Sequence, residues 1–289
     1  MLAQLIVSGI AHGALYALVA LGMTVIFKAT TVVNFGHGDL VMAGAYATYV
    51  FSVSFGIPMP LAILLGIVLL AVLGYIIQRG FIQPILSGPH LSIAMMAIAV
   101  GYALRGVARL FSGTQILTYP PIYPNGVYTI QGVILSSGDI VVTIAVALLL
   151  AILAVAFFAT PLGKLAQAVF QSARGAALIG INVNRFYAIM WGLGAALAAI
   201  GGILLAPNTL LYPDMSAWVL IRGFAAMALG GFGSLFGAVV GGLLLGIAEL
   251  LLGTYVSTNF IEVTAYLVII AVLLIRPTGL FGQKEMVRV

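Results

Sequence analysis

Cysteine is absent from this 289-residue chain, and charge is scarce, with 11 Lys and Arg residues and 6 Asp and Glu residues. The lack of cysteine excludes a disulfide framework and Cys-ligated zinc. Soluble domains carry roughly 25% charged residues, whereas this chain carries 6% and is 63% hydrophobic. So few charges cannot cover a water-soluble surface. The composition therefore predicts a protein surrounded by lipid, with no room for a soluble catalytic domain.

Long hydrophobic runs are present instead. Only helices and closed barrels satisfy their backbone polar groups inside a bilayer, and a barrel would show alternating segments of about ten residues. The continuous runs here approach the ~20 residues of a spanning helix. We therefore predict an all-α, polytopic membrane helix bundle forming a single domain, 1–289, with about eight or nine transmembrane segments. The candidate segments are 4–27, 38–55, 61–78, 92–111, 140–160, 186–206, 217–253 and 258–275.

The segment 217–253 is long enough for two crossings joined by a tight turn at 230–234, which brings the total to nine, or for one broken and one intact helix. Basic residues normally mark cytoplasmic loops. With the N-terminus outside and the C-terminus cytoplasmic, eight of the basic residues fall inside and three fall outside. The three are Arg105, Arg109 and Arg222. No Lys or Arg precedes the first apolar run, so we expect a retained first helix rather than a cleaved signal peptide.

Two connecting segments are long. Residues 112–138 are polar and rich in Pro and Tyr, which predicts an external loop with turns or a hairpin. Residues 161–185 are mildly basic and predict a cytoplasmic segment. A short helix there could insert into a groove of another protein, or the segment could be a solvated loop whose charges enforce topology. The residues concerned are Ala173, Arg174, Ala176, Ala177, Gly180, Ile181 and Asn182.

The run Asn34-Phe-Gly-His-Gly-Asp39 lies between two apolar segments. Gly-rich polar breaks line solute pathways in transporters, and intramembrane ionisable groups are usually functional. Asn34, His37 and Asp39, with His12, are therefore candidate pathway residues. Alternatively, these residues have only a local structural role. Asp39 would then be the N-cap of the second helix, and Asn34 and His37 would cap the helix or form local hydrogen bonds. No metal site is expected, because other ligands would have to come from isolated histidines.

The outward arginines and the small residues each allow two interpretations. Arg105 and Arg109 share one helix face and, like Arg222, could meet an anionic solute group or an acidic partner. They could also snorkel toward headgroups or pair internally with Asp214, Glu249 or Glu262. Small residues at four-residue spacing let helices approach closely, within this bundle or against a partner. The chief set is Gly233, Gly237, Gly241, Gly242 and Gly246.

Several stretches together resemble the LivH-type permeases of branched-chain amino acid ABC importers. These are 12–18 followed by 34–46, the 173–184 stretch ending in Gly-Ile-Asn, the Gly-rich block 224–249, and the C-terminal run 276–282. Gly36 and Asp39 replace the commoner Ala and Glu of that family. The run before Gly180 is also shorter than the corresponding loop of many other importers.

The resemblance implies a non-catalytic permease subunit in the bacterial cytoplasmic membrane. Its expected partners are a second homologous permease, two cytoplasmic P-loop ATPases and an external solute-binding protein, with an amino acid as solute. ATP and Mg would be bound by the ATPases, since this chain has no Walker A pattern and needs no cofactor. The stretch 173–182 would be the coupling helix. The competing hypothesis is a self-sufficient carrier or channel with His37 and Asp39 as a proton relay.

Overall fold

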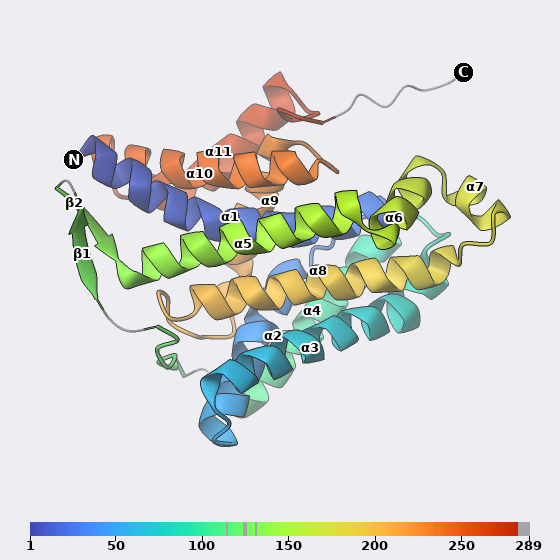
Figure 1. The fold of residues 1–289 in the computed structure, drawn as a ribbon, viewed down its shortest axis with the longest axis horizontal. Helices are drawn as coiled ribbons and strands as arrows, with labels where there is room; N and C mark the ends of the chain where they lie inside the picture. Colours follow the sequence, from blue (N-terminus) through green and yellow to red (C-terminus); the bar gives the residue numbers. More distant parts are fainter. Residues whose placement is uncertain (114, 124–125, 131, 283–289) are drawn as a thin grey trace.

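The computed structural model describes residues 1–113, 115–123, 126–130 and 132–282. This part of the chain is an almost wholly helical bundle whose long helices run side by side (Figure 1). The helices are α1 (Leu2–Thr30), α2 (His37–Tyr49), α3 (Met59–Ile77), α4 (His90–Ser112), α5 (Ser137–Ala159), α6 (Pro161–Gln171), α7 (Ala173–Leu178), α8 (Val183–Leu205), α9 (Met215–Gly230), α10 (Leu235–Tyr255) and α11 (Phe260–Ile275).

Irregular turns extend two of these helices. A π-helical turn, Val50–Ser54, continues α2, and a second one, Gln78–Ile82, continues α3 into the 3-10 turn Gln83–Ile85. The strands β1 (Val127–Ile130) and β2 (Val133–Ser136) form an antiparallel hairpin within the predicted 112–138 loop. The fold class predicted from composition, a polytopic helical bundle, is confirmed.

Each predicted apolar segment coincides with a helix. The ambiguous stretch 217–253 contains two helices, α9 and α10, joined by the short turn 231–234. Within the described residues, six helices are long and apolar enough to cross a membrane, namely α1, α3 with its extension, α4, α5, α8 and α10. The helices α9 and α11 have 16 residues each, about 24 Å of length against a hydrocarbon core of about 30 Å. The number of crossings therefore stays a prediction.

The turn between α9 and α10 needs glycine. Gly231 has φ of 109° and Gly233 has φ of 77°, values that an L side chain adopts only with strain. The C-terminal stretch packs on this turn, because the backbone N–H groups of Leu280 and Phe281 donate to the carbonyls of Leu229 and Gly230, both at 2.9 Å. The Gly-rich block and the C-terminal run thus form one structural unit.

Burial divides the bundle into centre and periphery. In the most apolar 18-residue stretch of each helix, 78% of the residues are buried in α1 and α8, compared with 11% in α5 and 22% in α4. The central helices are rich in Gly and Ala, so backbones approach closely. The peripheral helices carry exposed Leu, Ile and Phe side chains, as expected for a surface that faces lipid or another hydrophobic chain.

The two ends of the bundle differ. The N-terminus lies near the β1–β2 hairpin at one end, and α6 and α7 project at the opposite end (Figure 1). This arrangement separates the two long connecting segments by the full length of the helices.

Candidate functional site

The 161–185 segment is built from short helices separated by capping residues. Thr160 accepts a hydrogen bond from Gly163 N–H at 3.3 Å and caps α6, with Pro161 at its first position. Ser172 accepts from Gly175 N–H at 3.0 Å and caps α7. Asn182 accepts from Arg185 N–H at 3.0 Å and caps α8. Since each cap begins a helix, the sequence itself produces the helix–turn–helix course of this segment.

The projecting tip of this segment is apolar. Ala176 is buried and anchors α7, whereas Leu178 and Ile179 are 88% and 75% exposed. Gly180 follows with φ of 87°, which turns the chain back toward α8. The residues named from the sequence surround this tip. Arg174, Ala177, Gly180 and Asn182 are exposed, and Ala173 and Ile181 are half-buried.

Sequence reasoning missed Leu178 and Ile179 themselves. The available signal was a pair of large apolar residues inside a stretch otherwise made of small and basic ones. These two side chains leave an exposed apolar surface at the end of the bundle where α7 projects. We call residues 173–182 the α7 tip.

Apart from the exposed Phe35, the Asn34–Asp39 run is buried, and it leads into α2. Asn34 Oδ1 accepts from Gly36 N–H at 3.0 Å, and Gly36 occupies the N-cap position. The alternative in which Asp39 is the N-cap is therefore wrong, because Asp39 lies in the first helical turn. Its carboxylate instead accepts hydrogen bonds from Arg105 Nε and Nη2, at 3.1 and 3.0 Å.

His37 is fully buried beside Gly22 of α1, where a Cβ would lie 2.7 Å from its Nε2. Neither ring nitrogen makes a hydrogen bond to a described residue. A proton relay needs a connected chain of donors and acceptors, and no described contact joins His37 to Asp39. His12 is exposed on α1 and is likewise unconnected to the Asn34–Asp39 run. The four candidate pathway residues thus do not form one constellation in this structure.

The arginines of α4 pair internally, in what we call the outer network. Arg105 lies between Asp39 and Asp214, with Nη1 3.7 Å from Asp214 Oδ1. Arg109 binds both oxygens of Asp214 at 2.8 and 3.0 Å. These four residues connect α2, α4 and the start of α9. Of the interpretations that the sequence left open, internal pairing holds for these arginines.

Arg222 belongs to a second cluster, which we call the inner network. Its Nε donates to Glu249 Oε1 at 2.7 Å, and Tyr16 O–H donates to Glu249 Oε2 at 2.7 Å. Glu249 is 1% exposed. The network therefore joins α9, α10 and α1, and the guanidinium compensates the charge of a buried carboxylate.

The small residues predicted to pack helices serve this bundle. Gly242 and Gly246 of α10 lie against Ala17 and Gly13 of α1. On the other face of α10, Gly237 and Gly241 lie against α9. Gly233 was grouped with them and does not belong there, because it lies in the 231–234 turn rather than on a helix face. The other four glycines therefore pack against helices of this chain, and none of them is available to contact a partner permease.

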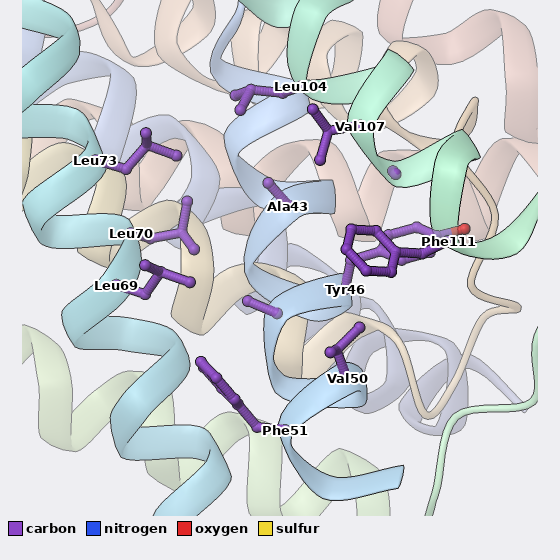
Figure 2. A pocket seen from close by; sticks show the side chains of 12 residues that line it. Ala43, Tyr46, Val50, Phe51, Leu69, Leu70, Leu73, Leu104, Val107 and Phe111 are labelled. Atoms are coloured by element: carbon purple, nitrogen blue, oxygen red, sulfur yellow. The ribbon is translucent and has the colours of Figure 1, made fainter. Parts of the chain in front are cut away.

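A cavity of about 230 Å³ lies between α2, α3 and α4 (Figure 2). Its lining is apolar apart from the hydroxyl of Tyr46, which hydrogen-bonds Ser112 at 3.1 Å. No charged side chain is among its lining residues, so it offers nothing to the charged ends of an amino acid. The described residues also contain no group of three His, Cys, Asp or Glu that could hold a metal ion.

The model of the family described as "branched-chain amino acid transport system / permease component" matches residues 5–276. The high-affinity branched-chain amino acid transport system permease protein LivH of Escherichia coli strain K12 is 30% identical over 99% of this chain and 97% of that protein. The corresponding permease protein BraD of Pseudomonas aeruginosa is also 30% identical, with the same coverage. A chain of the structure titled PsaBC from Streptococcus pneumoniae in complex with Fab shares the fold, with 16% identity, a TM-score of 0.50, and coverage of 94% of this chain and 91% of that one.

Proposed function

Because this chain belongs to the family of permease components of branched-chain amino acid transport systems, we propose that it forms, with a second homologous permease, the membrane pathway of an ATP-driven importer. The relatives LivH and BraD carry branched-chain amino acid transport in their names. Leucine and its branched analogues are therefore the proposed solutes. The chain itself is a non-catalytic, multi-pass membrane protein.

The proposed topology has nine crossings, with the N-terminus outside and the C-terminus in the cytoplasm of a bacterial inner membrane. The charge distribution supports it. The end of the bundle that carries α6 and α7 also carries Lys164, Arg174 and Arg185, and cytoplasmic loops are enriched in such residues. The 112–138 segment with its hairpin then faces outward, where it offers a docking surface to an external solute-binding protein.

The α7 tip is the proposed contact with the ATPases. The exposure of Leu178 and Ile179 at the cytoplasmic end is the observation that carries this proposal, since an apolar knob on a short helix fits a groove of a partner protein. ATP and Mg²⁺ would bind to the two partner ATPases. Their closure would displace the α7 tips and shift the permease pair between outward-open and inward-open arrangements.

The test is reconstitution of this chain with its co-purifying proteins into proteoliposomes. We expect two P-loop ATPases and a second permease to co-purify, and leucine uptake to require both ATP and the binding protein. Uptake by this chain alone, without ATPases, would instead establish the self-sufficient carrier.

A charge at the tip provides the sharper test of coupling. Leu178→Glu should leave the assembly folded but lower ATP-driven uptake by about tenfold or more, because a carboxylate would be buried in an apolar groove. Lys164→Gln is the matched control, since it changes the net charge by the same amount at an exposed position of α6. Equal uptake by the two variants would refute the assignment of the tip.

A further inference from the structure

A second cavity, of about 440 Å³, lies next to the inner network. It is lined by Tyr212, Trp218, Ile221, Arg222, Glu262 and Tyr266, which come from the α8–α9 loop, α9 and α11. Ligand pockets of roughly 300–1,000 Å³ typically combine apolar walls with a few convergent polar groups. This lining has that composition, with one cation, one carboxylate and three aromatic rings.

Arg222 reaches the cavity with part of its hydrogen-bonding capacity unused. Its Nε is bonded to Glu249, and its Nη2 donates to the carbonyl of Ile261 at 3.3 Å. Within the described residues, Nη1 has no hydrogen-bond partner. These contacts hold the guanidinium in place, and the Trp218 ring lies 5.0 Å from its central carbon. A positioned guanidinium with free N–H groups is suited to binding a carboxylate.

Glu262 supplies the opposite charge. It is exposed in the first turn of α11, directly after Ile261, whose carbonyl contacts Arg222. Glu249 already neutralises Arg222, and Glu262 forms no salt bridge with another described residue. The aromatic walls add ring faces that attract a cation. The cavity therefore offers an ammonium site beside a carboxylate site.

We propose that this cavity binds the solute, with the α-carboxylate on Arg222, the α-ammonium on Glu262, and the aliphatic side chain against Trp218, Ile221 and Tyr266. This inference rests on the proposed amino-acid transport function and adds the residues that recognise the solute. It assigns Tyr212 a positioning role, because its hydroxyl accepts a hydrogen bond from Trp218 Nε1 at 3.0 Å. The inner network would then hold Arg222 in a carboxylate-binding orientation.

The chain provides its own reporter of occupancy. It has two tryptophans; Trp191 is 1% exposed in the core, whereas Trp218 lines the cavity. We would titrate the full-length chain, in nanodiscs of phosphatidylglycerol, with leucine and follow tryptophan fluorescence. The comparison ligands are leucinamide, which lacks the carboxylate, and 4-methylpentanoate, which lacks the ammonium. The variant Trp218→Phe should abolish the signal.

Glu262→Gln is the principal variant, because Glu262 is exposed and its replacement leaves the inner network intact. We expect it to weaken leucine binding about tenfold or more, the effect of losing one charge-assisted contact, and to leave 4-methylpentanoate binding unchanged. Asp139→Asn, which changes another carboxylate in the first turn of a helix, is the matched control and should bind leucine as the wild type does. The pair Arg222→Met with Glu249→Met should remove discrimination between leucine and leucinamide.

Three results would overturn the proposal: no leucine-dependent change at Trp218, equal leucine binding by Glu262→Gln and Asp139→Asn, or a signal that responds to phosphatidylethanolamine and not to leucine. The last would make the cavity a lipid headgroup site. If ATP-driven leucine uptake persists in the reconstituted importer in any of these cases, the transport function stands and this site assignment alone fails. Absence of uptake as well would reject the proposed function.

Discussion

The outer and inner networks use the same chemistry, arginine paired with carboxylate, in different surroundings. In the outer network, the side chains of Arg109 and Asp214 are 49% and 59% exposed, so this pair lies at the surface of the chain. In the inner network, Arg222 and Glu249 are 12% and 2% exposed. An exposed pair contributes little and can open, whereas a buried pair cannot lose one member without leaving a charge in an apolar environment. We infer that the outer network tolerates rearrangement and that the inner one is permanent.

Removing one member of the inner network should have the largest effect. Glu249→Ala leaves Arg222 without its carboxylate and should lower the free energy of unfolding by about 3–5 kcal/mol. Thermal unfolding of the purified chain, followed by fluorescence-detected size exclusion, measures this loss. The double variant Arg222→Met with Glu249→Met should recover most of the stability, since it removes both charges. A Glu249→Ala protein as stable as the wild type would show that the inner pair is not buried as a charged pair.

Asp39→Asn tests the buried end of the outer network and should have an intermediate effect. Asp39 is 5% exposed, but Arg105 keeps a second carboxylate, Asp214, within 3.7 Å. We expect a loss of about 1.5–3 kcal/mol, the range for a hydrogen bond to a charged group. A double-mutant cycle with Arg105→Gln isolates the pairwise coupling. Coupling near zero would mean that Asp39 and Arg105 contribute independently.

Asp214→Asn tests the exposed end and should have the smallest effect. The pair with Arg109 is half-exposed, so the expected loss is within about 1 kcal/mol and should shrink as salt is raised. Unfolding at low and high ionic strength measures both. A salt-independent loss as large as that of Glu249→Ala would remove the distinction between the two networks.

Most of the long helices were predictable from the sequence, because they are continuous apolar runs bounded by Pro, Gly or charged residues. The short helix of the α7 tip was predictable in outline, since Ser172 and Asn182, on either side of it, are good capping residues. The exposure of Leu178 and Ile179 was not, because an apolar pair in a short segment can equally be buried against its neighbours.

The charge pairs could not be predicted from their spacing in the sequence. Asp39 and Arg105 are 66 residues apart and Arg222 and Glu249 are 27 apart, so only the packing of α2 on α4 and of α9 on α10 brings them together. For the same reason, the sequence did not show whether the candidate pathway residues lie together. His12 and His37 are polar residues on apolar helices, and the sequence does not say which face of each helix is buried.

The sequence by itself determined that this protein is a bundle of apolar helices in a membrane. A chain with so few charges cannot be stable in water, and in lipid its backbone N–H and C=O groups must form their hydrogen bonds within each segment. It also determined the order of the helices and the family. The tertiary structure alone decided which arginine meets which carboxylate, which glycines let helices touch, and which charged side chains border the cavity beside α9 and α11. These features depend on the rotation and tilt of each helix, which arise from side-chain packing between segments far apart in the chain.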